Sequence, residues 1–206
     1  MGVLATIAYA GNLTSDETDK DLAYQWETSI ATLGQFAVLF GIVMLLTWGL
    51  DRREILALRR PPSWWQAAGI SLLVIIGVFI VSGVVARFGN AGEEQGLIPK
   101  DFDSSRLPQF VAFAAVVVIV APVVEELLFR GVGFSLLEPH GRVRAIVLVG
   151  LAFALLHGLL IGFPVIASFG MGLAYLRAKT ASIYPCILLH ACFNAFSLTV
   201  GIAAAS

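Results

Sequence analysis

Charged residues are scarce in this chain of 206 residues. Asp, Glu, Lys and Arg make up 13% of it and hydrophobic residues 58%, whereas an ordinary soluble domain has about 25% charged residues. The formal net charge is -1, so the basic excess of a nucleic-acid-binding surface is lacking. We therefore expect an integral protein of the lipid bilayer with no nucleic-acid partner.

Cysteine is scarce too. Cys186 and Cys192 lie six residues apart in one apolar run, which separates their Cα atoms by roughly 9 Å along a helix and turns them to different faces. They cannot pair with each other, and we expect both to be small buried hydrophobic side chains. The N-terminus lacks the charged start and cleavage site of a signal peptide, so residues 1–30 are predicted to be a polar, non-cytoplasmic tail.

Six apolar runs of roughly membrane-crossing length follow one another along the chain. They are 31–50, 66–88, 107–137, 143–162, 164–176 and 182–204, of which the fifth is short. None shows the alternating pattern of barrel strands, so helices are expected. The prediction is an all-α, polytopic membrane protein with about six transmembrane helices. Residues 31–106 hold two helices joined by a basic loop, and residues 107–206 hold the four helices of a catalytic core.

Basic residues predict the orientation, because short cytoplasmic loops retain Lys and Arg. One side of the predicted bundle carries Arg52, Arg53, Arg59, Arg60, Arg142, Arg144, Arg177 and Lys179. The opposite side is richer in acidic residues. We expect a multi-pass protein of the cell membrane with these basic loops in the cytoplasm and both termini outside.

Polar and ionisable side chains interrupt three of the last four runs. The patterns are Glu125-Glu126-x-x-x-Arg130, Phe153-x-x-x-His157 and His190-x-x-x-Asn194. An ionisable group costs roughly 2.5 kcal/mol or more at the bilayer centre, so such groups face a partner or a water-filled cavity and indicate a functional site. Counted from the basic end of each run, these side chains lie about 12–21 Å deep. We therefore expect them to converge in one layer.

Helix geometry separates the two glutamates. Glu126 and Arg130 are four residues apart with the acid first, the favourable order for an intrahelical ion pair. Glu125 points about 100° away and has no partner nearby in sequence, so we expect it to be a general base. Pro122 removes one backbone hydrogen bond just before them and predicts an irregular helix.

The other two motifs each place two side chains on one helix face. His190 and Asn194 can donate hydrogen bonds to a developing oxyanion, and each well-placed donor is worth about 3–4 kcal/mol. Phe153 is expected to pack beside His157 and to fix the approach of its helix.

In this order, and within hydrophobic helices, the three motifs resemble those of the CPBP family, which contains the CAAX-type prenyl-protein endopeptidases and bacterial self-immunity proteins. The resemblance covers roughly residues 107–204. It implies an intramembrane endopeptidase that opens toward the cytoplasm and cleaves a protein or peptide substrate at or in the membrane. It also implies that Glu125 activates a water together with His157, and that His190 and Asn194 form the oxyanion site. Glu126 and Arg130 match the remaining motif positions.

Other protease classes lack their residues here. The sequence has no H-E-x-x-H zinc motif and no aspartate within the six runs, and Ser135 lies too close to its helix end to serve as a nucleophile. We expect glutamate chemistry without a cofactor; the alternative is zinc held by Glu125, His157 and His190. A proton-coupled transporter and a non-catalytic membrane scaffold remain alternative functions.

Overall fold

The computed structural model describes residues 22–89 and 102–205, and every regular element within these ranges is a helix. The predicted all-α fold is confirmed. Residues 1–21 of the predicted polar tail lie outside the described residues. Its last part is already structured, because Leu22–Tyr24 forms a 3-10 turn and the first long helix, α2 (Trp26–Leu46), begins earlier than predicted.

Four stretches of the described residues are long and apolar enough to cross a membrane. They are Trp26–Leu46, Trp64–Val85, Ser104–His140 and Tyr184–Ala203, and they support a multi-pass membrane protein. The fourth and fifth predicted spans are not among them. The first of these, α8 (Arg142–His157), has 16 residues, or about 24 Å, less than the roughly 30 Å of a hydrocarbon core. The second, α9 (Phe163–Thr180), carries two cations in its last turn.

The third span is one continuous rod of alternating helix types. It consists of α5 (Leu107–Ala115), η4 (Val116–Val120), α6 (Ala121–Glu126), η5 (Leu127–Gly133) and α7 (Phe134–Leu137). The segments η4 and η5 are π-helical. The rod covers the predicted run 107–137 from end to end.

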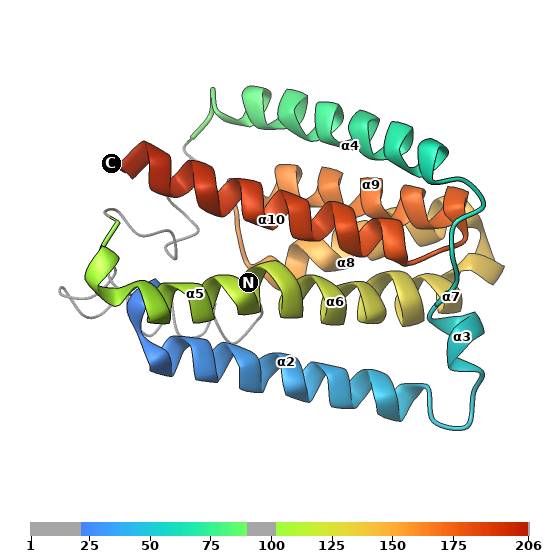
Figure 1. Ribbon diagram of the computed structural model, residues 1–206. Coiled ribbons are helices and arrows are strands. Elements are labelled where there is room, and N and C mark those ends of the chain that lie inside the picture. The colour runs from blue at the N-terminus through green and yellow to red at the C-terminus, as the bar shows by residue number, and fades with distance from the viewer. Residues whose placement is uncertain (1–21, 90–101, 206) are drawn as a thin grey trace.

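The long helices run side by side as a bundle with α2 at one edge and α4 (Trp64–Val85) at the other (Figure 1). α2 packs against α5 and η5, and α10 (Tyr184–Ala205) packs against η4, α6 and α4. α9 lies between α8 and α4 and also contacts α10. The α8–α9 hairpin fills only the half of the bundle nearest α3 (Arg52–Ile55), so its tip, and with it the end of α8, lies partway along the bundle (Figure 1).

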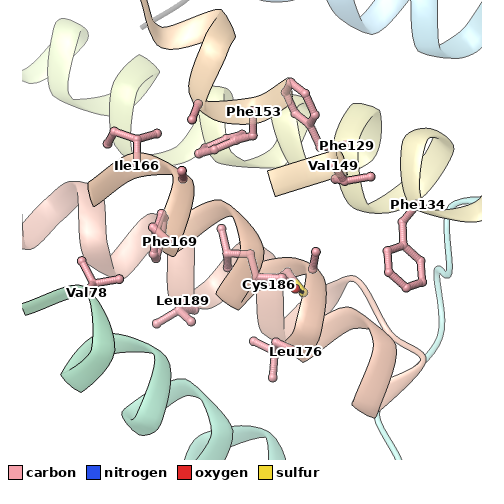
Figure 2. Close-up of a cluster of buried hydrophobic side chains, with 14 of the residues drawn as sticks. Val78, Phe129, Phe134, Val149, Phe153, Ile166, Phe169, Leu176, Cys186 and Leu189 are labelled. Carbon is pink, nitrogen blue, oxygen red and sulfur yellow. Dashed lines mark hydrogen bonds between the residues drawn. The ribbon is translucent and has the colours of Figure 1, made fainter. Parts of the chain in front are cut away.

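Buried apolar side chains gather where α8, α9 and α10 meet the rod (Figure 2). Phe129, Phe134, Phe153 and Phe169 form the aromatic part of this core. The outward faces of α2 and α4 are instead apolar and exposed, as the outer surface of a bundle in lipid must be, since lipid tails are as apolar as leucine. Burial therefore marks contact between helices rather than hydrophobicity as such.

Small residues let α8 and α9 approach closely. A Cβ atom added at Gly170 would lie 2.8 Å from the carbonyl oxygen of Gly150, a distance that no real side chain tolerates. At the end of α8, Gly158 has φ 67° and forms a left-handed cap, a conformation that glycine adopts without penalty. These two positions require glycine to build the hairpin.

The loop between α2 and α4 is fixed to other helices at the basic end of the bundle. Ser135 donates its hydroxyl hydrogen to the carbonyl of Ile55 at 2.7 Å. Arg59 Nε donates to the carbonyl of Ala181, also at 2.7 Å. Ser135 is thus occupied by a structural contact, in keeping with its rejection as a nucleophile.

Two predictions about single side chains were wrong. Arg177 was placed in a cytoplasmic loop, but α9 continues to Thr180 and Arg177 is buried inside the bundle at 4% exposure. Cys192 was expected to be buried and is exposed, while Cys186 is buried as predicted, and both are free cysteines. The two errors have different causes. The apolar run 164–176 ends before α9 does, and an apolar run does not show the direction in which a side chain such as that of Cys192 points.

Candidate active site

The two glutamates lie at the end of α6, between the π-helical segments η4 and η5. The N–H of Ala121 bonds to the carbonyl of Val116, five residues earlier, as in a π-helix. The next bond of that pattern would run from residue 122 to the Val117 carbonyl, but Pro122 has no N–H. The irregularity that Pro122 predicts therefore takes the form of a π turn with one carbonyl left over, and π turns are frequent at functional sites.

Asn194 of α10 supplies the missing donor. Its Nδ2 donates to the Val117 carbonyl at 2.9 Å. This bond ties α10 to the rod at Val117, about two turns before Glu125. The carboxamide predicted for the oxyanion site is thus anchored by one of its two amide hydrogens, while the other is not needed for this contact.

Glu126 and Arg130 form the ion pair that their spacing predicts. Arg130 Nη1 lies 2.9 Å from Glu126 Oε1, and both side chains are fully buried. Arg130 Nη2 donates to the Gly170 carbonyl of α9 at 2.7 Å, and the guanidinium lies over the ring of Phe153, 4.5 Å from its centroid. The pair therefore joins the rod to α9 and α8 at the same time.

His190 of α10 lies between the two glutamates. Its Nδ1 donates to Glu126 Oε1 at 2.9 Å, and its Nε2 lies 3.7 Å from Glu125 Oε2. Because a carboxylate only accepts, Nδ1 carries a proton in this arrangement. The rings of Phe153 and Phe169 meet the imidazole edge to face at 5.6 and 5.5 Å. His190 and Glu125 are both buried, at 2% and 6% exposure.

His157 is the last residue of α8 and joins this cluster through Phe153. Its Nδ1 donates to the Phe153 carbonyl at 2.7 Å, and the two rings lie 4.5 Å apart. Because the carbonyl accepts, the neutral ring keeps an unprotonated Nε2. His157 can therefore accept a proton or orient a water at the tip of the hairpin.

The zinc alternative needs three ligands around one point. Within residues 22–89 and 102–205, no three His, Cys, Asp or Glu side chains are grouped so that they could hold a metal ion. Glu125, His157 and His190 are thus not assembled as a ligand set within these residues.

The structure thus brings Glu125, Glu126, Arg130 and His190 into direct proximity. His157 is joined to them through Phe153, whereas Asn194 bonds to the Val117 carbonyl and to none of the four in the described contacts. Two carboxylates with different partners and an imidazole between them can accept, hold and release a proton, which is the requirement for general acid–base catalysis. Glu126 Oε2 and Arg130 Nε are buried atoms with no hydrogen-bond partner among the described residues.

The sequence reasoning missed the part that α9 plays. The Gly170 carbonyl receives Arg130 Nη2, and Arg177 Nε donates to the Arg130 carbonyl at 3.2 Å. A glycine inside an apolar run was a weak signal for the first contact. For the second, no spacing rule distinguishes a buried arginine at a helix end from one that marks a cytoplasmic loop.

Nearly half of the chain matches a protein-family model. Residues 107–196 match the model described as type II CAAX prenyl endopeptidase Rce1-like. No curated protein and no solved structure matches the chain. The matched range runs from the start of α5 into α10 and contains every candidate site residue named above, whereas α2 and α4 lie outside it.

Proposed function

We propose that this chain is a membrane protease in which Glu125 is the base that activates the hydrolytic water. The match of residues 107–196 to the Rce1-like type II CAAX prenyl endopeptidase family supports the proposal. The substrate of a protease is a protein or peptide. We further propose that this substrate is presented at or in the membrane. The prenyl group of a CAAX substrate is not part of the proposal.

The observation that carries this proposal is the position of His190 between two unlike carboxylates. Glu126 has a buried guanidinium as its partner, so its charge is balanced within the protein. Glu125 faces the imidazole of His190. Glu125, Glu126 and Arg130 together leave one negative charge, which a single proton on either His190 or Glu125 neutralises. A buried cluster is favoured when its net charge is zero, because unpaired buried charges are costly.

That proton serves the reaction when it resides on His190. Glu125 is then an ionised base, and Nε2–H of His190 is a donor for the substrate oxygen. Glu125 removes a proton from water while the water oxygen attacks the carbonyl carbon of the scissile bond. The resulting oxyanion accepts hydrogen bonds from His190 Nε2 and from the second amide hydrogen of Asn194. The protonated Glu125 then gives its proton to the leaving amine as the C–N bond breaks, so water and peptide become an acid and an amine.

His157 has a supporting part in this proposal. With Nδ1 donating to the Phe153 carbonyl, its Nε2 is an acceptor that can orient the attacking water. Phe153 fixes this ring and also contacts Arg130 and His190. One aromatic side chain therefore positions the groups on both sides of the reaction centre.

We place the whole α8–α9 hairpin within the membrane, which gives six embedded helices in total. Two observations support this placement. Helix α9 is covered by α8, α4 and α10, and the tip of the hairpin lies partway along the bundle (Figure 1). The basic end, with α3 and the α8 start, faces the cytoplasm in this proposal, following the excess of Lys and Arg there.

The test is cleavage of a reporter by purified protein in lipid nanodiscs. Two reporters are used, a transmembrane peptide and a farnesylated C-terminal peptide, so that the substrate class is determined at the same time. Glu125→Gln should fold and lose cleavage by about 100-fold or more, because an amide cannot take a proton from water. His157→Ala should lower the rate as well. Glu54→Gln, at an exposed position of α3, is the matched control and should cleave like wild type. Equal cleavage by all four proteins would discard this mechanism.

A further inference from the structure

Helix α9 contains none of the predicted site residues, yet it forms hydrogen bonds with Arg130 at two points. The Gly170 carbonyl accepts Arg130 Nη2 at 2.7 Å. About two turns further along α9, Arg177 Nε donates to the main-chain carbonyl of Arg130 at 3.2 Å. The first contact fixes the side chain of Arg130, and the second fixes its backbone.

The burial of Arg177 calls for a reason. The helix dipole stabilises a cation in the last turn of a helix even when that cation is exposed to solvent. Lys179 is such an exposed cation, and its ammonium lies over the Tyr175 ring at 5.5 Å. Orientation in the membrane likewise needs only an exposed cation. Arg177 is instead 4% exposed, with its guanidinium over the Phe134 ring at 5.2 Å. Removing a guanidinium from water is unfavourable unless its contacts compensate.

The π-helical turn explains what this contact achieves. The N–H of Phe134 bonds to the carbonyls of Gly131 and Phe129, so it bypasses the Arg130 carbonyl, its partner in a regular α-helix. Arg177 donates to that carbonyl. The arginine thereby stabilises the π form of η5 at the residue whose side chain binds Glu126.

A continuous chain of polar contacts then leads to the reaction centre. Arg177 holds the Arg130 carbonyl, Arg130 holds Glu126 Oε1, and Glu126 Oε1 accepts Nδ1 of His190. The imidazole presents Nε2 to Glu125 at 3.7 Å. A shift of the Arg130 backbone would be passed to His190 through two short hydrogen bonds.

We propose that Arg177 is a positioning residue that holds the π turn at Arg130 and thereby keeps Nδ1–H of His190 hydrogen-bonded to Glu126, with Nε2 turned toward Glu125. This deepens the proposed function, on which it rests, and it predicts an effect on the rate rather than on substrate binding. Without Arg177 the turn relaxes, Glu126 loosens its hold on Nδ1, and the imidazole no longer presents a fixed Nε2 to Glu125.

The experiment records the imidazole ¹⁵N resonances of histidine-labelled protein. The chain has three histidines, so His140→Gln and His157→Gln assign the signals of His190 by difference. The resonances are compared in the Glu125→Gln background, where Glu126 and Arg130 balance each other and His190 is a neutral imidazole that donates from Nδ1. In that background Arg177→Met should bring the Nδ1 and Nε2 shifts of His190 closer together, because a free tautomer equilibrium averages them. With Glu125 present, the kcat of Arg177→Met should fall by roughly tenfold to 100-fold at unchanged KM, the range for a small misplacement of a reacting group. Arg177→Lys keeps a donor and should restore part of both.

Arg59→Met is the matched control, since Arg59 makes the same kind of bond, Nε to a main-chain carbonyl, at the same end of the bundle but without contact to Arg130. Unchanged His190 signals and kcat in Arg177→Met, or equal changes in Arg59→Met, would overturn the proposal. If Arg177→Met does not fold, Phe134→Leu loosens the arginine through its ring contact and should shift the same two signals, and unchanged signals would again overturn it. Failure of the wild type to cleave either reporter would refute the proposed function alone, because the resonance measurement needs no substrate.

Discussion

His190 is the side chain that gives the two neighbouring glutamates different surroundings. Glu126 is fully buried and shared between the guanidinium of Arg130 and Nδ1 of His190. Within residues 22–89 and 102–205, the polar partner seen for Glu125 is Nε2 of the same imidazole, at the longer distance of 3.7 Å. Two carboxylates with unlike environments can take unlike roles, one holding charge and the other moving a proton.

Arg130→Ala tests how much of the fold depends on the buried pair. The variant leaves Glu126 as a buried charge without its cation, which costs about 3–5 kcal/mol. We expect a large loss of unfolding free energy in detergent, measured by denaturant or thermal unfolding. Glu125→Gln, by contrast, should unfold close to wild type.

Arg142→Ala is the control for that measurement. Arg142 and Glu138 have the same four-residue spacing and lie 3.2 Å apart, but their side chains are 61% and 35% exposed. An exposed pair contributes about 0–1 kcal/mol. Similar losses in both alanine variants would contradict the view that burial of the Glu126 pair makes it essential.

At the scale of elements, the irregular rod α5–α7 is the element whose main chain is bound by side chains of the neighbouring helices. Its two π segments flank the glutamates and leave two carbonyls, those of Val117 and Arg130, to be bound by side chains of α10 and α9. A regular helix would satisfy these carbonyls internally and would offer the neighbouring helices nothing to bind. The irregularities therefore connect the rod to the rest of the core.

Pro122→Ala tests this connection. Alanine restores an N–H that can take the Val117 carbonyl from Asn194, and it removes a residue that is poorly tolerated within helices. We expect the variant to be at least as stable as wild type and to cleave the reporter more slowly. Pro164→Ala, in the first turn of α9 where no such donor is needed, should change neither property. A Pro122→Ala protein with full activity would show that Asn194 does not depend on this turn.

Gly170→Ala tests the contact between α8 and α9. The added methyl group would lie 2.8 Å from the Gly150 carbonyl oxygen and 3.1 Å from its Cα. Forcing the helices apart should destabilise the protein by about 1–3 kcal/mol and move the Gly170 carbonyl away from Arg130. Gly77→Ala in α4 has no atom within 4 Å of the new Cβ and should be neutral or stabilising by up to about 1 kcal/mol. Equal unfolding midpoints for both variants would rule out this close packing.

At the scale of the whole molecule, the sequence predicted what depends on periodicity and composition. Apolar runs gave the positions of the long helices, and the four-residue spacing of Glu126 and Arg130 gave their ion pair. The resemblance to the CPBP family, read from three motifs, is confirmed by the family match over residues 107–196. The π turns and the burial of Arg177 could not be predicted, because both depend on contacts between helices rather than on neighbours in sequence. The shortness of α8 was missed because the apolar run continues past Gly158, where the left-handed cap ends the helix.

The orientation of the whole bundle is the last prediction, and it follows from the basic residues at one end. Single cysteines are introduced at Arg53 in the α2–α4 loop and at Ser104 before α5, both exposed, in a protein whose two native cysteines are replaced by alanine. In intact cells a membrane-impermeant maleimide should label Ser104→Cys at once and Arg53→Cys only after permeabilisation, since a cytoplasmic loop is shielded by the bilayer. The reverse pattern would invert the topology and turn the tip of the α8–α9 hairpin toward the cytoplasm (Figure 1).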